Sequence, residues 1–77
     1  MDETISDDIK ILEAEAAELV AERAAMEGRI RELREKEDIP RGIVFSKEIF
    51  EAQQNKLRLD VDIQFRRNRI NRLKSGF

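Results

Sequence analysis

Asp60 and Asp62 are two carboxylates only two residues apart in the second half of this chain. A carboxylate pair can bind a metal ion or exchange protons during catalysis. On a helix, however, residues two apart point about 200° away from each other, so these side chains would diverge. We therefore expect salt bridges to Arg23 or Arg58 here, and no catalytic role.

Other catalytic and cofactor-binding residue sets are missing from the sequence. The chain contains no cysteine and no histidine, which excludes disulfides and the usual ligand sets of zinc, haem and iron–sulfur clusters. Ser6, Ser46 and Ser75 have no histidine to activate them, and the three glycines are too scattered to form a phosphate-binding loop. The sequence therefore predicts a protein that is not an enzyme and needs neither metal nor cofactor.

The segment from Gln64 to Lys74 is the strongest candidate for binding a charged ligand. It resembles the arginine-rich helices that enter RNA grooves, where arginine and asparagine contact phosphates and bases. The same cations could instead dock on an acidic protein patch or pair with an acidic helix of this chain. The candidate contacts are Arg66, Arg67, Arg69, Arg72 and Lys74.

Charges are sorted along the chain, and this sorting predicts how its elements lie. Residues 1–38 contain thirteen acids and six bases, a net charge of −7, whereas residues 39–77 contain four acids and nine bases, a net charge of +5. The most acidic and the most basic segments lie at opposite ends of the sequence. Two helices packed antiparallel would bring these ends together and neutralise part of the basic field.

A long first helix is indicated by apolar residues that recur every three or four positions, with Arg23 at one place where an apolar residue is due. Pro40 and Gly42 supply the turn that ends this helix. We expect a helix at about 5–37 and a turn at about 38–45. The apolar positions are Ile5, Ile9, Leu12, Ala16, Leu19, Met26, Ile30 and Leu33.

The second helix is expected at about 47–74, with Ser46 as its N-cap and Gly76 closing its end. One alternative is a β-strand, because apolar and polar residues alternate strictly from Leu57 to Phe65. The flanking segments favour a helix, since they lack turn residues and carry good helix formers. Residues 1–77 then form a single all-α domain, an antiparallel two-helix hairpin that resembles a coiled coil.

If the turn is centred near residue 42, each residue i should face residue 84 − i, within about one helical turn. This register predicts a set of pairs between oppositely charged side chains. The expected pairs are Glu15–Arg69, Glu18–Arg66, Glu13–Arg72, Arg23–Asp60 or Arg23–Asp62, Glu27–Lys56 or Glu27–Arg58, and Lys36–Glu48.

Both helices carry a second apolar face, which a two-helix hairpin cannot bury. We expect the first-helix seam to pack on one face of the second helix, namely Phe50, Leu57, Val61 and Phe65. The face left for a partner or a second copy is then Ile49, Leu59, Ile63, Ile70 and Leu73, with a stripe of small residues, Ala14, Ala17, Ala21 and Ala24. The two assignments on the second helix could be exchanged. The alanines also have a simpler explanation, because alanine is the best helix former on a solvated face.

These features predict a non-enzymatic protein–protein interaction module: a small helical regulator, inhibitor or assembly factor. Its expected partners are itself, as a homodimer that forms a four-helix bundle, and an unidentified protein. Nucleic-acid binding through the arginine-rich segment is the alternative. No stretch has the length or apolarity of a signal peptide or a membrane span, so we expect a soluble cytoplasmic protein without membrane contact.

Overall fold

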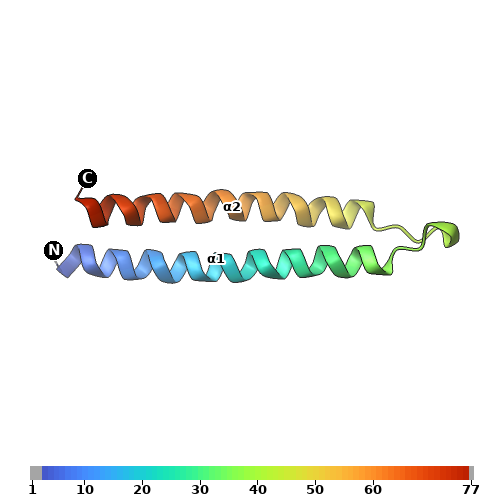
Figure 1. Ribbon diagram of the computed structural model, residues 1–77, viewed down its shortest axis with the longest axis horizontal. Coiled ribbons are helices and arrows are strands. Elements are labelled where there is room, and N and C mark those ends of the chain that lie inside the picture. Colours follow the sequence, from blue (N-terminus) through green and yellow to red (C-terminus); the bar gives the residue numbers. More distant parts are fainter. Residues whose placement is uncertain (1–2, 77) are drawn as a thin grey trace.

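The computed structural model describes residues 3–76, which form two long helices joined by a short turn (Figure 1). Helix α1 spans Glu3–Lys36, a 3-10 turn η1 spans Ile39–Arg41, and helix α2 spans Ser46–Ser75. The helices pack antiparallel in a rod of 62 × 16 × 12 Å, with the two ends of the chain at the same end of the rod. The expected all-α fold of two packed helices is confirmed, and the strand alternative for residues 57–65 is wrong because this segment lies within α2.

The inner face of α1 follows the predicted seam. Ile9, Ala16, Ile30 and Leu33 are buried, and the other predicted seam residues are half-buried. Arg23 occupies its place in this repeat and is also half-buried. The spacing between successive seam positions from Ile5 to Glu37 is thus four and three residues in alternation, without a break, as in a heptad repeat.

The inner face of α2 is the one that sequence analysis assigned to a partner, so that assignment was wrong. Ile63 and Ile70 are only 2% and 8% exposed, and Ala52 is buried with them. The half-buried members of this face are Ile49, Leu59 and Leu73.

The expected core residues of α2 are exposed instead, because of the spacing along the helix. The inner face repeats along nearly the whole of α2, because the spacing between its residues is three and four in alternation. Its positions are Ile49, Ala52, Lys56, Leu59, Ile63, Arg66, Ile70 and Leu73. The opposite face consists of Phe50, Leu57, Val61 and Phe65. Its spacings of seven, four and four residues do not match the repeat of α1, and it covers only half of the helix. A heptad repeat that continues over the full length gives more interhelical layers, so it forms the intrachain contact.

The turn is held by backbone hydrogen bonds. Asp38 and Ile43 bond to each other in both directions, with N–O distances of 2.8 and 2.9 Å. Gly42 takes a left-handed conformation with φ of 73°, and its N–H donates to the carbonyl oxygen of Ile39. A side chain at this φ would be strained, which explains the glycine. The turn therefore fixes the register between the helices.

The N-terminal end of α2 differs in detail from the expectation. Ser46 is the first helical residue, while Phe45 occupies the N-cap position without a side-chain hydrogen bond to the helix. The backbone N–H of Phe45 donates to the carboxylate of Glu37 at 3.2 Å, which links the ends of the two helices. At the other end, Gly76 closes α2 in the left-handed conformation, as predicted.

Candidate interaction surface

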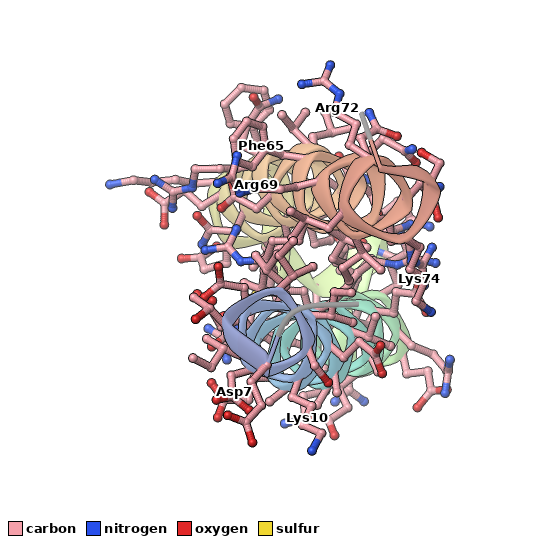
Figure 2. The ribbon with its side chains drawn as sticks, turned by 90° about the vertical axis from the view of Figure 1, so that its left-hand side faces the viewer. Asp7, Lys10, Phe65, Arg69, Arg72 and Lys74 are labelled. Carbon is pink, nitrogen blue, oxygen red and sulfur yellow. The ribbon has the colours of Figure 1, made fainter. Side chains whose placement is uncertain are left out.

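Four large apolar side chains project into solvent from the face of α2 opposite α1. We call Phe50, Leu57, Val61 and Phe65 the outer strip. They are 57–68% exposed, although they lie in the middle of a well-formed helix. Figure 2 shows Phe65 and Arg72 on the side of α2 that points away from α1. At a rise of 1.5 Å per residue, the outer strip is about 22 Å long.

An open groove borders the outer strip where the C-terminal part of α1 meets the N-terminal part of α2. Its volume is about 810 Å³, and Phe50 and Leu57 line it together with Ile30 from α1. Charges of both signs surround these apolar residues, including Arg34 and Glu35. The outer strip thus continues into a depression that can accept a protruding side chain.

Besides the single exposed side chains Ile11 and Val20 of α1, two apolar regions lie on the surface. The small-residue stripe Ala14, Ala17, Ala21 and Ala24 lies on the solvent side of α1, where nothing in the hairpin covers it. At the tip of the hairpin, Ile39 and Val44 are 77% and 55% exposed. Neither feature forms a continuous row of large side chains like that of the outer strip.

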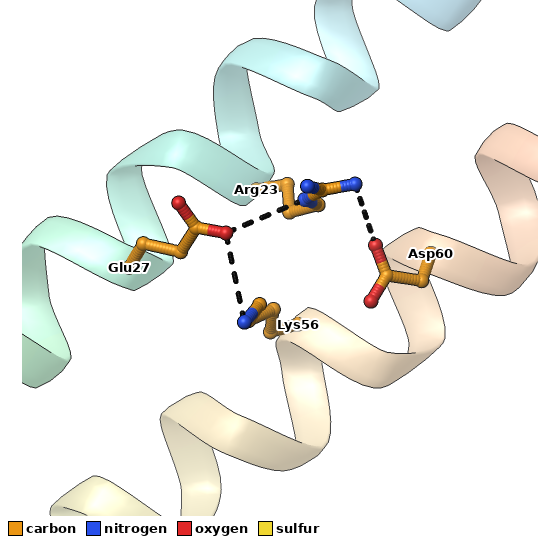
Figure 3. A network of polar contacts seen from close by, with 4 residues as sticks. All are labelled: Arg23, Glu27, Lys56 and Asp60. Atoms are coloured by element: carbon orange, nitrogen blue, oxygen red, sulfur yellow. Dashed lines mark ion pairs between the residues drawn. The ribbon is translucent and has the colours of Figure 1, made fainter.

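Four charged residues form a network across the middle of the hairpin (Figure 3). Arg23 contacts Asp60 at 2.9 Å and Glu27 at 3.5 Å, and the same oxygen of Glu27 contacts Lys56 at 3.5 Å. The predicted Arg23–Asp60 and Glu27–Lys56 pairs are therefore confirmed. All four side chains are 36–40% exposed, so each pair contributes little energy, on the order of 0.2–1 kcal/mol. Their effect is to select the antiparallel register.

At the open end of the rod, away from the turn, the ion pairs differ from the predicted ones by about one helical turn, one in each direction, so the register itself is the predicted one. Arg66 pairs with Glu15 at 3.4 Å rather than with Glu18, and Lys74 rather than Arg72 contacts Glu13, at 3.6 Å. Arg66 occupies a seam position, and its side chain is 27% exposed. A long side chain at such a position can pack its aliphatic part on the seam while its guanidinium contacts an acid, here Glu15, about one turn from the expected partner. Within residues 3–76, no ion pair joins Lys36 to Glu48.

The basic cluster divides into two groups. Arg66 and Lys74 are paired with α1. Arg67, Arg69 and Arg72 are exposed, and none of them forms an ion pair in the part of the chain that the structure describes. Three of the five candidate contacts for nucleic acid or an acidic partner are thus unpaired in the hairpin.

The two aspartates of the candidate pair lie on different sides of α2, as expected for residues two apart on a helix. Asp60 faces Arg23, whereas Asp62 lies on another side of α2 and its carbonyl oxygen accepts a hydrogen bond from Arg66. Among residues 3–76 no three acidic side chains form a group that could hold a metal ion. Neither helix in this range contains an apolar segment that could cross a membrane.

Comparison of this chain with protein-family models, with curated proteins and with solved structures gave no match. The functional proposal therefore depends on the surface of the hairpin itself.

Both apolar faces of α2 are evident in the sequence, but their observed roles are the reverse of the predicted ones. The signal that distinguishes them is present in the sequence. When Lys56 and Arg66 are accepted as seam positions, the inner face becomes an unbroken repeat of three and four. Both have long aliphatic stems that can pack between helices while the charge reaches solvent. Excluding charged residues from the seam concealed this repeat.

Proposed function

We propose that this chain is a non-enzymatic protein-binding module, a small helical regulator, inhibitor or assembly factor that binds its partner through the outer strip of α2. One observation carries the proposal: Phe50, Leu57, Val61 and Phe65 are 57–68% exposed on one face of α2. Single exposed apolar side chains are normal on protein surfaces, but contiguous rows of them mark contact sites. Aromatic residues in particular are enriched at the centres of interfaces.

The amount of exposed surface supports the same function. The hairpin exposes 6023 Å², whereas a globular protein of 9.0 kDa exposes about 4,900 Å². The excess, about 1,100 Å², is similar to the area of about 800 Å² that each partner buries in a standard interface. The radius of gyration is 17.8 Å, compared with about 11 Å for a compact domain of this length. An elongated surface of this kind suits a helical partner that lies alongside it.

The core of the hairpin is also thin. Seven of the side chains at positions 3–76 are buried, three of them on α2, and in this range no side chain is less than 2% exposed. A partner that covers the outer strip would add apolar burial at about 25 cal/mol per Å² and so stabilise α2.

Site-specific photocrosslinking tests the proposal. A photoreactive phenylalanine analogue is placed at position 50 or 65, and the chain is expressed in its native cells and irradiated. We expect crosslinks to a defined protein, whether a different protein or a second copy. The matched control carries the analogue at Glu32, on the exposed side of α1. Absence of crosslinks from both outer-strip positions, or equal labelling from position 32, would contradict the proposal.

The second candidate function is nucleic-acid binding by the end of α2. The observation that favours it is that Arg67, Arg69 and Arg72 are exposed and form no ion pair within residues 3–76. The paired acids Glu13 and Glu15 lie nearby on α1 and weaken the positive field there.

A labelled random-sequence RNA or DNA probe tests this second candidate. Binding should be measurable at low salt, should weaken steeply as the salt concentration rises, and should be lost when Arg67, Arg69 and Arg72 are changed to alanine. The control is Arg29→Ala with Arg31→Ala and Arg34→Ala on α1, which removes the same charge elsewhere. Equal binding by both triple variants would assign the interaction to net charge alone.

A further inference from the structure

Four charged residues border one side of the outer strip. Successive residues of a helix are rotated by 100° about its axis, and on this basis the four residues occupy an angular sector about 40° wide next to the strip. They are Glu51, Arg58, Asp62 and Arg69. We call this row the charged edge. Within residues 3–76 none of its members forms an ion pair, and Arg58 donates a hydrogen bond only to its neighbour Asn55. The opposite border of the strip carries the uncharged amides Gln53 and Gln64.

The order of charges on this edge is self-complementary. Glu51 and Arg69 lie nine residues before and after position 60, and Arg58 and Asp62 lie two residues before and after it. Each acid of the charged edge therefore mirrors a base, whereas Lys47 and Arg72, at the two ends of the strip, mirror each other as like charges. When two copies of α2 meet antiparallel around a two-fold axis near residue 60, Glu51 faces Arg69 of the second copy, and Arg58 faces its Asp62. A parallel contact would instead oppose each residue with its own copy, which places like charges together.

The same axis interleaves the apolar side chains. At 1.5 Å per residue, Val61 lies about 1.5 Å from the axis along α2, and Phe65 about 7.5 Å in the same direction. Because the second copy runs the opposite way, its Leu57 and Phe50 lie on this same side of the axis, at about 4.5 and 15 Å. Along each half of the contact, side chains from the two copies thus alternate. This alternation is the arrangement by which ridges of one helix fill the grooves of another.

We infer that the outer strip of α2 binds a second copy of this chain, antiparallel, with the charged edge setting the register. The inference rests on the proposed function, since it names the occupant of the proposed surface. The outer strip lies opposite the inner seam, so the two α2 helices meet at the centre and each α1 lies outside. The four helices form a flat layer, in contrast to a bundle around a common axis.

Two charge-reversal variants test the register. The basic-edge variant combines Glu51→Arg and Asp62→Arg, and the acidic-edge variant combines Arg58→Glu and Arg69→Glu. Each variant makes its edge uniformly charged, and its self-association should weaken roughly a hundredfold or more, because four attractive contacts become repulsive. Mixing the two variants should restore a dimer. Glu51 and Arg69 are about 27 Å apart on one helix, so only contact between chains can produce this rescue.

Light scattering coupled to size exclusion, at tens of micromolar chain, measures the masses. The wild type should have the mass of a dimer, each variant that of a monomer, and the mixture that of a dimer. The matched control is Glu18→Arg with Glu32→Arg, which changes the net charge as the basic-edge variant does but on the solvent side of α1, and it should remain dimeric. Circular dichroism of each variant reports whether its helices are retained.

Two outcomes would overturn the inference. A wild-type chain that stays monomeric excludes the second copy as the occupant, while crosslinks from positions 50 and 65 to a different protein would still support the proposed function. A wild-type dimer that neither charge-reversal variant disrupts places the contact between copies on another surface.

Discussion

The two faces of α2 are built from similar apolar residues but have opposite positions in the hairpin. The inner face carries Ile63 at 2% exposure, and the outer face carries Val61 at 68%, only two residues away. Overall hydrophobicity does not distinguish them, because the outer face has the two largest side chains, Phe50 and Phe65. The difference lies in their spacing: the inner face repeats as a heptad over the full helix, and the outer face does not. A long antiparallel contact selects the face whose repeat matches its partner's, even when two seam positions are charged.

The largest expected difference between the two faces is in stability. Ile63→Ala should lower the free energy of unfolding by about 2–4 kcal/mol, because it leaves a cavity in the seam. Val61→Ala on the outer face should change it by no more than about 0.5 kcal/mol. Urea denaturation followed by circular dichroism, at concentrations low enough for the chain to be monomeric, measures both. Equal losses would contradict the assignment of the faces.

A smaller effect is expected when the inner repeat is made fully apolar. Lys56→Leu should raise the free energy of unfolding by about 1 kcal/mol, since a leucine buried at a seam position outweighs a half-exposed ion pair with Glu27. The control, Gln54→Leu, adds an apolar side chain to the outer strip between Phe50 and Leu57. It should leave the stability of the monomer nearly unchanged and strengthen self-association in light scattering. A loss of stability in Lys56→Leu would show that its charge contributes more than its position in the seam.

The smallest expected effect is the coupling energy of the ion pair between Glu15 and Arg66, at the end of the rod away from the turn. A double-mutant cycle with Glu15→Ala and Arg66→Ala should give a coupling of about 0.5 kcal/mol, which decreases as salt is added. The control is a cycle with Glu18→Ala and Arg69→Ala, two residues that were predicted to pair with Arg66 and Glu15, respectively, and that form no ion pair within residues 3–76; it should give a coupling near zero. Coupling between Glu18 and Arg69 of the same size as that between Glu15 and Arg66 would contradict the observed choice of partners at the open end.

Much of the fold could be predicted from local signals. Pro40 and Gly42 located the turn, the spacing from Ile5 to Leu33 gave the first helix, and the sorted charges gave the antiparallel direction. The pairs Arg23–Asp60 and Glu27–Lys56, in the middle of the hairpin, also followed from this register. At the open end the same rule selected the wrong partners, since a long side chain can reach an acid about one helical turn away in either direction.

The candidate surface was less predictable than the fold. The sequence showed that α2 has two apolar faces, but the choice between them depended on how well each matched α1 over many layers. Residue type alone pointed to Phe50, Leu57, Val61 and Phe65 as the core, since large aromatic and aliphatic side chains are usually buried. Lys56 and Arg66 interrupt the row of apolar residues on the inner face, so its repeat is less evident in the sequence.

The sequence by itself determined two long helices, the turn between them, their antiparallel direction and the excess of apolar surface. These properties follow from periodicity, turn residues and charge order, which are local or nearly local in the chain. Only the tertiary structure decided which face of α2 lies inward, which acid each base of the open end contacts, and which side chains remain in water. Those choices depend on the simultaneous fit of many layers along a 62 Å rod, and the energy of that fit belongs to the pair of helices together.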